Sequence, residues 1–232
     1  MNRRDYWKAL AGWMLVLPGV TRNCEWFGGV EKSFVAEGRE VRLTIDDGPD
    51  PRQTPHILEA LAAAGVTATF FVIGRKAEAH PHLCRQMATA GHSVQNHTHT
   101  HPSATFWASG LERAREQIRR CSAAIEDATG KPPGEFRAPV GMANPFVHMA
   151  AREAGLRMSG WSASGHDGIC HDPARVVERI RRRVFPGAIL LLHESHLPAM
   201  AHGERACTLS TLLNTLRDDG YHFENKRDAP TG

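Results

Sequence analysis

The chain has 232 residues, of which 41% are hydrophobic, and a formal net charge of +3. A chain of this length can bury one sizeable core, and α/β barrels use about 200 or more residues as a single domain. The charge is mild and no basic cluster is interleaved with aromatic residues, so we expect no nucleic-acid partner. The 14 histidines concentrate between residues 80 and 101 and between 148 and 202, which directs attention to metal binding.

We treat residues 1–40 as an N-terminal segment. Its apolar run at 9–20, ALAGWMLVLPGV, is too short to span a bilayer. We expect residues 1–22 to pack on the domain or to contact a membrane surface peripherally through Arg3, Arg4 and Lys8. A cleaved signal segment is the alternative, although no A-x-A site follows the run.

The cysteines bear on the compartment. There are five, spread widely and never in a C-x-x-C pair, which supports neither a disulfide framework nor a cysteine zinc site. Buried thiols in a reducing compartment are the simpler interpretation. We therefore favour the cytoplasm or the cytoplasmic membrane, with a periplasmic or secreted protein as the alternative.

From residue 41 the sequence alternates between short apolar runs and segments with helical spacing. This pattern predicts an α/β fold, a distorted (β/α) barrel of about seven parallel strands with its active site at the C-terminal rim of the strands. We assign residues 41–225 to this domain and 226–232 to a tail. The expected strands are 41–45, 67–73, 92–96, 134–137, 156–161, 187–193 and 221–224.

Capping residues mark the expected helices. Thr54, Asn144 and Asp172 each precede a proline, which is favoured at the first helical position, and Thr208 is expected to begin the last helix. The longest predicted helix covers 109–130 and ends at Gly130. The basic run at 179–187, RIRRRVFPG, is typical of the solvated face of a helix, and an anionic glycan or membrane surface is the alternative.

Titratable and polar side chains gather where the predicted strands end. Because a barrel places its active site at the C-terminal ends of its strands, these residues should share one rim. Trp161 and Asp167 are both expected after the fifth strand. The full set is Asp46, Asp47, Asn96, His97, His101, Arg137, Trp161, Asp167 and His193.

The stretch NHTHTHP indicates a metal site. His97 and His101, four residues apart, can share an ion on one helical turn or across a tight loop, whereas His99 would point elsewhere in an extended segment. One carboxylate with two histidines leaves open positions on the ion, as catalytic zinc sites require. Surface polar residues in a loop are the alternative interpretation.

These motifs resemble the polysaccharide deacetylases, the chitooligosaccharide-deacetylase-like domain of carbohydrate esterase family four. The stretch TIDDGP is similar to the first motif of that family, and HTHTH matches its H-[ST]-x-x-H motif. FRAPVG (136–141), WSASGHD (161–167) and ILLLH (189–193) follow in the family's order, so the resemblance spans 41 to about 224.

The resemblance implies a hydrolase with one divalent ion. Asp47, His97 and His101 would be its ligands, and Asp46 would be the general base. Zinc is the favoured ion, and cobalt, manganese and iron are alternatives. We expect strand alternation to send the two adjacent aspartates to different sides of the ion.

The resemblance also implies the remaining catalytic side chains. Arg137 would hold Asp46 through a charge-assisted pair. His193 would be the general acid, with Asp167 as its partner. The substrate would contact Pro139, Val140, Gly141, Trp161 and Leu191.

Departures from the family pattern concern the sugar groove. Val140 stands where the family has an aromatic residue, although a valine retains the backbone N–H that serves as oxyanion donor. Ala138 replaces a common proline, Ser164 stands at a position that is often aspartate, and Gly168 replaces a tryptophan. The acyl-handling residues are therefore intact and the groove is altered.

The expected function is metal-dependent removal of an N-acetyl group from an amino sugar in a bacterial-type polysaccharide, oligosaccharide or glycolipid. The partner is thus an acetylated glycan or glycolipid. One alternative is a catalytically silent glycan-binding domain of the same fold. Another is a metallophosphohydrolase with His-Asp pairs, because GHD at 165–167 and CHD at 170–172 both occur.

Overall fold

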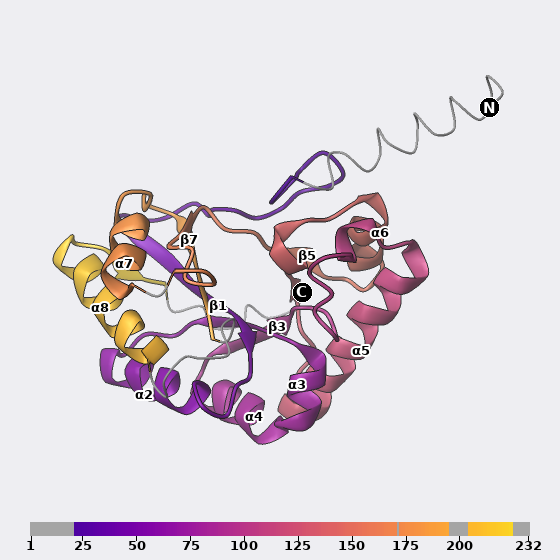
Figure 1. Cartoon of the computed structure of the whole chain (residues 1–232), viewed down its shortest axis with the longest axis horizontal. Coiled ribbons are helices and arrows are strands. Elements are labelled where there is room, and N and C mark those ends of the chain that lie inside the picture. The colour runs from indigo at the N-terminus through magenta and orange to yellow at the C-terminus, as the bar shows by residue number, and fades with distance from the viewer. Residues whose placement is uncertain (1–20, 171, 195–203, 225–232) are drawn as a thin grey trace.

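The computed structural model describes residues 21–170, 172–194 and 204–224. A parallel sheet forms its centre, with strands in the order β5, β4, β3, β2, β1, β7, β6 and with β8 paired to the start of β1 (Figure 1). The sheet curls into an incompletely closed barrel, since β5 and β6 at its ends do not pair. The predicted distorted barrel is confirmed. The strands are β1 Glu40–Gly48, β2 Thr69–Val72, β3 Ser93–Asn96, β4 Glu135–Phe136, β5 Arg157–Met158, β6 Ala163–Ser164, β7 Ala188–His193 and β8 His222–Phe223.

Strand β6 was not predicted. It has only two residues and lies in a stretch with no apolar run, so hydrophobic periodicity gives no signal for it. It is held by pairing of Ala163 with Leu190 of β7. Because β6 lies between Trp161 and Asp167, the expectation that both follow the same strand was wrong, and Asp167 follows β6 instead.

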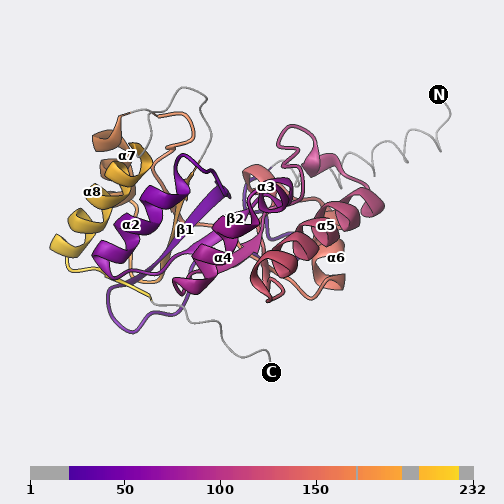
Figure 2. The same cartoon turned by 90° about the horizontal axis from the view of Figure 1, so that it is seen from below.

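Helices cover the outside of the sheet in two packed groups. In one group α8 contacts both α2 and α7, and in the other α5 contacts α3, α4 and α6 (Figure 2). This arrangement leaves the strand ends free to carry polar residues. The helices are α2 Thr54–Ala64, α3 Gly74–Ala79, α4 Pro81–Thr89, α5 Leu111–Thr129, α6 Pro145–Glu153, α7 Pro173–Arg181 and α8 Glu204–Asp218, with 3₁₀ turns η2 Phe106–Ala108 and η3 Pro139–Gly141.

The expected helix ends are largely correct. Gly130, with φ of 74°, ends α5, and the side chains of Asn144 and Asp172 cap α6 and α7. Two starts were wrong. Thr54 lies inside the first turn of α2, where its hydroxyl donates to the Glu194 carboxylate, and α8 begins at Glu204, one turn before the expected residue.

Strand alternation separates the core from the site along β1. Val41, Leu43 and Ile45 belong to the apolar core that the helices cover. Thr44 and Asp46, between them, contact Arg137. Because successive side chains of a strand point to opposite faces, one face of β1 supports packing and the other supports chemistry.

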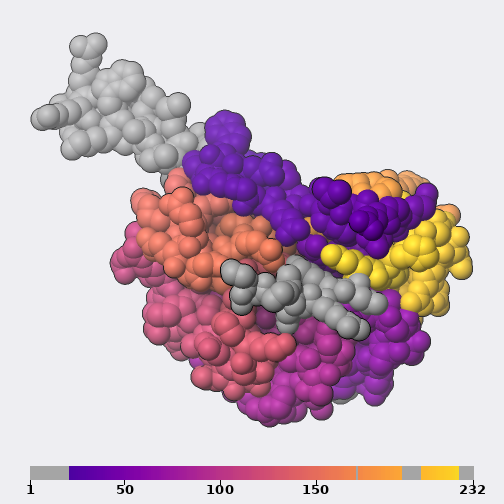
Figure 3. Space-filling view, turned by 180° about the vertical axis from the view of Figure 1, so that it is seen from behind, coloured from indigo at the N-terminus to yellow at the C-terminus, as the bar shows by residue number. Residues whose placement is uncertain are grey.

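Residues 21–34, the N-terminal strap, lie across the open side of the barrel. Glu31 exchanges backbone hydrogen bonds with the stretch after β5, its N with Met158 O (2.9 Å) and its O with Gly160 N (2.8 Å). Phe34 N then donates to Gly187 O beside β7 (2.9 Å). Figure 3 shows the indigo strap crossing between these two parts of the molecule. The strap therefore connects β5, at one end of the sheet, with the start of β7, one strand from the other end.

The predicted membrane contact concerns residues 1–22, of which 1–20 lie outside the described residues. Within the ranges that the structure describes, no helix has the length and apolar character needed to cross a bilayer.

Candidate active site

The two adjacent aspartates lie at the end of β1, and both line one cleft. Regular alternation would place Asp47 on the opposite face from Asp46. The pairing of β1 with β2 instead shifts between Asp46 and Gly48, and Asp47 adopts a left-handed φ of 73°. Such a bulge re-aims a side chain. The expected regular alternation was therefore wrong at Asp47, because the bulge turns its side chain toward the cleft, and the placement of the two carboxylates on different sides of an ion stays a prediction.

A lysine side chain holds the backbone of the bulge. Lys76, in α3, donates from Nζ to the backbone oxygen of Asp47 at 2.6 Å. Burial lowers the pKa of Lys76, although the nearby carboxylate of Asp47 acts in the opposite direction. The contact fixes the backbone at the residue whose side chain must face the cleft.

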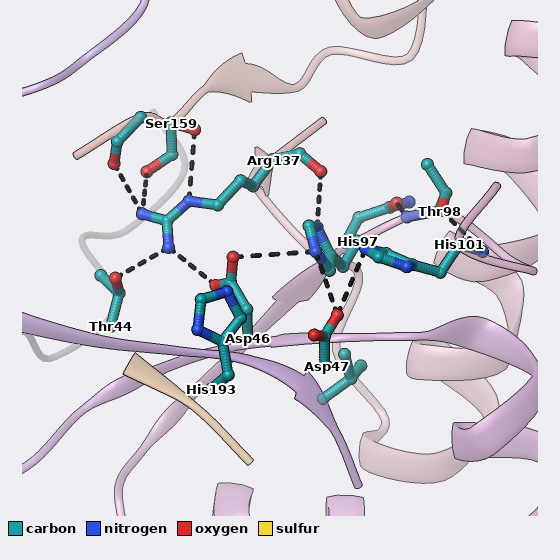
Figure 4. A network of polar contacts seen from close by, with 12 residues as sticks. Thr44, Asp46, Asp47, His97, Thr98, His101, Arg137, Ser159 and His193 are labelled. Atoms are coloured by element: carbon teal, nitrogen blue, oxygen red, sulfur yellow. Dashed lines mark hydrogen bonds and ion pairs between the residues drawn. The ribbon is translucent and has the colours of Figure 1, made fainter. Parts of the chain in front are cut away.

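Two histidines after β3 complete a possible ligand set. His97 Nε2 and His101 Nε2 lie 3.5 and 3.3 Å from Asp47 Oδ1, as Figure 4 shows. His97 Nδ1 lies 2.7 Å from Arg137 O, and because a carbonyl oxygen only accepts, Nδ1 must carry the hydrogen. The Nε2 lone pair is then directed to the cleft, which is the arrangement of a metal-ligating histidine.

The separations of these atoms fit a divalent ion. A tetrahedral ion with bonds near 2.0–2.1 Å keeps its ligand atoms about 3.3 Å apart. The ligand atoms of Asp47, His97 and His101 all lie within 4.8 Å of one another, with two separations close to that value. His99 is outside the group, and its Nε2 lies 3.7 Å from Glu78 Oε2.

Arg137 lies behind Asp46 and is fully buried. Its Nη1 donates to Asp46 Oδ1 at 2.7 Å and to Thr44 Oγ1 at 2.8 Å, while Nη2 donates to Gly160 O at 2.6 Å (Figure 4). A buried charge is tolerated only when it is paired and hydrogen-bonded, and Arg137 meets both conditions. The guanidinium therefore fixes the orientation of Asp46 without lining the cleft itself.

His193 ends β7 and lines the cleft beside Asp46. Its Nδ1 lies 2.9 Å from Asp167 Oδ1, and its backbone N donates to Asp167 Oδ2 at 2.7 Å. Burial alone would lower the pKa of His193, but the charge and hydrogen bond of Asp167 outweigh it and raise the pKa to about 9. Arg205 Nη1 donates to Asp167 from the other side, 3.3 Å from Oδ2.

Asp167 is charged in this setting. Burial acts to raise its pKa, but His193 and Arg205 together hold that pKa below its ordinary value. An imidazolium whose Nδ1 is bound to a carboxylate leaves Nε2 to donate a proton, so this pair can act as a general acid.

The predicted substrate-binding residues fall into two groups. Val140, Trp161 and Leu191 line the cleft. Pro139 and Gly141 are buried behind it, and a Cβ on Gly141 would lie 2.6 Å from the ring of Trp161. Pro139 and Gly141 can therefore act only through the shape of the turn that holds Val140.

Backbone strain concentrates at the cleft. Six non-glycine residues in the described ranges have a positive φ, which costs about 1–3 kcal/mol each. Such strain persists where surrounding contacts enforce it for function. Four of the six line the cleft, namely Asp47, His101, Val140 and His166.

Several residues at the site were not expected from the sequence. Arg22 of the strap and His166 and Ile169 of the loop after β6 line the cleft, and Arg205 holds Asp167. None of them belongs to a segment with hydrophobic periodicity or to a motif whose spacing suggests metal ligands. Only the HD pair at 166–167 marks this loop, and there Asp167 faces His193 rather than a metal group with His166.

A curled parallel sheet that carries carboxylates and histidines at its C-terminal strand ends defines an α/β-barrel enzyme with a metal-type site. This class contradicts the His-Asp phosphohydrolase alternative, which requires a mostly helical fold. Residues 35–159 match the polysaccharide deacetylase family. The chain belongs to that family.

Individual relatives agree with this membership. A chitooligosaccharide deacetylase of Bradyrhizobium sp. (strain ANU 289) is 38% identical over 180 residues, 76% of this chain and 79% of the relative. A peptidoglycan-N-acetylglucosamine deacetylase of Listeria monocytogenes is 32% identical over 80% of this chain and 37% of its own length. A solved family 4 carbohydrate esterase pseudoenzyme of Bacillus anthracis superposes with a TM-score of 0.74 at 26% identity, over 83% of this chain and 65% of the other. The predicted enzyme class, a carbohydrate N-deacetylase, is confirmed.

Proposed function

We propose that this chain removes acetyl groups from N-acetylglucosamine residues of a chitooligosaccharide, a peptidoglycan strand or a lipid-linked glycan. The proposal assigns one divalent ion, with zinc favoured, to Asp47, His97 and His101. The observation that carries it is the convergence of these three side chains in one cleft with Asp46 and His193. The named activities of the Bradyrhizobium and Listeria relatives supply the substrate class.

An ion held by Asp47, His97 and His101 would supply polarisation of the amide carbonyl and acidification of the attacking water. Asp46, held by Arg137, accepts the proton of that water as its oxygen adds to the carbonyl carbon. The backbone N–H of Val140 donates to the carbonyl oxygen as negative charge develops there. His193 then gives its Nε2 proton to the amide nitrogen as the C–N bond breaks, and acetate and a free amine result.

The size of the cleft supports an acyl group as the reacting part. Its volume is about 140 Å³, below the range of roughly 300–1,000 Å³ of pockets that enclose a whole drug-sized ligand. It can take an N-acetyl group and part of one sugar, with Trp161 and Leu191 as apolar walls. The rest of the glycan must lie outside it.

The silent glycan-binding alternative is disfavoured by the residues present. The Bacillus anthracis relative is a pseudoenzyme, so the fold alone does not require turnover. In this chain each of the five positions that the reaction needs holds a competent side chain, and all five line the cleft: Asp46, Asp47, His97, His101 and His193.

The test is acetate release from chitotetraose, from peptidoglycan fragments and from an N-acetylglucosamine glycolipid. Zinc-, cobalt-, manganese- and iron-reconstituted protein should be compared with chelator-treated protein. We expect turnover that the chelator abolishes and that the metal restores. Turnover unaffected by metal removal, or binding of glycan by fully loaded protein without any acetate release, would overturn the proposal. The predicted location in the cytoplasm or at the cytoplasmic membrane stays a prediction.

A further inference from the structure

Part of the basic run at 179–187 contacts the loop after β6, which contributes residues to the active-site cleft. Arg179 in α7 donates from Nη1 to Gly165 O at 3.2 Å, and Arg183 Nη1, one turn later, lies 3.4 Å from His166 Nε2. Gly165 and His166 belong to the loop after β6. Gly165 packs against Val176 of α7, and His166 lines the cleft. Both arginines are exposed, as the interpretation of this run as a solvated helix face expects, and each also contacts the loop after β6.

The loop is pressed directly onto α7. A Cβ on Gly165 would lie 2.5 Å from Val176 Cγ1 and 2.6 Å from Val176 O. Real Cβ atoms do not approach that closely, so the absence of a side chain permits this contact. The packing holds this loop against α7, the helix that carries Arg179.

A third arginine, Arg22, comes from a distant part of the chain and lies at the cleft that His166 lines. Arg22, in the strap, lines the cleft together with His166. Burial lowers the pKa of His166, and the positive charges of Arg183, Arg179 and Arg22 lower it further. All three guanidinium groups are therefore within electrostatic range of one side chain of the cleft wall.

Neighbouring arginines of the same helix region have anionic partners. Arg175, Arg181 and Arg182 lie 3.2, 2.7 and 2.7 Å from the carboxylates of Asp172, Asp219 and Glu178. Across residues 21–170, 172–194 and 204–224, no carboxylate lies within 4.0 Å of the three arginines at the cleft. Asp167, the carboxylate near His166, is already bound by His193 and Arg205.

Like charges gathered without counter-charges repel one another, and an anionic ligand relieves this repulsion. We propose that Arg22, Arg179 and Arg183 form an anion subsite, which selects acetylated glycans with a phosphate or carboxylate group next to the reacting sugar. The inference rests on the proposed deacetylase function and narrows its substrate class. Guanidinium groups suit both oxyanions, because they form charge-assisted and bidentate hydrogen bonds with either.

A membrane surface fits these three arginines less well. Arg22 lines the cleft that also holds Asp46 and His193, and Arg179 and Arg183 contact the loop that forms part of its wall. A flat layer of lipid headgroups cannot enter that cleft. A single oxyanion on a glycan that is bound with its N-acetyl group in the cleft can reach them.

The experiment compares three matched substrates with metal-loaded protein. These are chitotetraose, chitotetraose 1-phosphate, and a tetrasaccharide that alternates N-acetylglucosamine with glucuronic acid. The variants are Arg22→Gln, Arg179→Gln, Arg183→Gln and the triple variant, with Arg182→Gln as the matched control because Arg182 is paired with Glu178. Both kcat/KM and equilibrium binding by calorimetry are measured, and thermal unfolding checks the fold.

We expect wild-type protein to prefer one of the two anionic substrates, which also shows whether phosphate or carboxylate is the group. Each single variant should lose about three- to tenfold in kcat/KM on that substrate, and the triple variant on the order of 10²-fold. Arg179→Gln and Arg183→Gln, which lie outside the cleft lining, should change kcat/KM on chitotetraose by less than about twofold. High salt should weaken the preference. The control should keep it.

Failure of the subsite and failure of the function are distinguishable. Equal turnover of neutral and anionic substrates, or a preference that survives in the triple variant, overturns the subsite and leaves the deacetylase intact. If no substrate turns over, the deacetylase proposal fails, and equal binding of all three glycans then overturns the subsite as well. Arginine-dependent sedimentation with phosphatidylglycerol vesicles, without any glycan preference, assigns the cluster to a membrane instead.

Discussion

Replacement of Asp46 by asparagine tests two functions of one side chain. Asp46 Oδ1 lies 2.7 Å from Arg137 Nη1, and Oδ2 lies 3.7 Å from His97 Nε2 at the cleft. The first oxygen compensates a buried charge, and the second faces the region where water attacks. The variant should therefore lose stability and turnover, while the three metal ligands remain in place.

Both losses can be given a magnitude. The side chains of Asp46 and Arg137 are 3% and 0% exposed, and removing one partner of such a pair costs roughly 3–5 kcal/mol. Because Arg137 keeps neutral acceptors at Thr44 and Gly160, we expect the lower end, about 3 kcal/mol. For a chain of this size that lowers Tm by about 6–12 °C. Turnover should fall by roughly 10²–10⁴-fold, the worth of a positioned general base, with KM little changed.

The assay combines acetate release, metal content and calorimetry at one metal concentration. Asp50→Asn is the matched control, because the Asp50 carboxylate accepts from Arg52 N outside the cleft, and its activity should stay within about twofold. Wild-type turnover in Asp46→Asn would refute the base assignment. Metal loss equal to that of Asp47→Asn would show instead that both aspartates ligate the ion.

Three further outcomes are expected. Asp47→Asn should weaken metal binding at least about tenfold. His99→Ala should keep full metal occupancy in metal analysis, because His99 faces away from the ligand group. Metal loss in His99→Ala would contradict the proposed site. Asp167→Asn should move the upper limb of the pH–rate profile to lower pH by about 1–3 units, because Asp167 raises the pKa of His193 to about 9 and the acid form is active below that value; an unchanged profile would remove Asp167 from the mechanism. Burial lowers the pKa of His92 to about 4, so its contribution to stability is full above pH 6.5 and declines as pH falls toward 4, by about 3 kcal/mol in all. His92→Asn, whose Oδ1 can accept the backbone hydrogen bond that Nδ1 accepts, should flatten that decline in calorimetric unfolding, and an unaltered slope would contradict the cause.

Much of the site follows from local sequence. A parallel barrel brings the ends of all its strands to one rim, so polar residues after apolar runs must meet there. This logic brings Asp46, His97 and His193 together although they are distant in sequence. Spacing adds the choice of His101 over His99, because only one of the two can share an ion with His97 across the turn.

The conformation of Asp47 could not be read from the sequence. Alternation predicts a carboxylate on the far face of β1, and no local signal marks the bulge, since an aspartate with a φ of 73° is uncommon. The conformation is imposed by tertiary contacts, among them the hydrogen bond from Lys76 Nζ. The position of Asp47 at the end of the strand was therefore predictable, and the backbone conformation that turns its side chain to the cleft was not.

The cleft wall also depends on contacts that the sequence does not reveal, here between segments that are far apart in the chain. His166 is aligned by a two-residue strand and by the packing of Gly165 on α7, and Arg22 arrives from the strap. No periodicity relates these segments, because each is held by backbone bridges rather than by an apolar face. Asp47, His97 and His101 follow apolar strands, and the two histidines have a motif spacing, so the sequence marks them. Arg22 and His166 have no such local mark, and only the fold brings them to the same cleft.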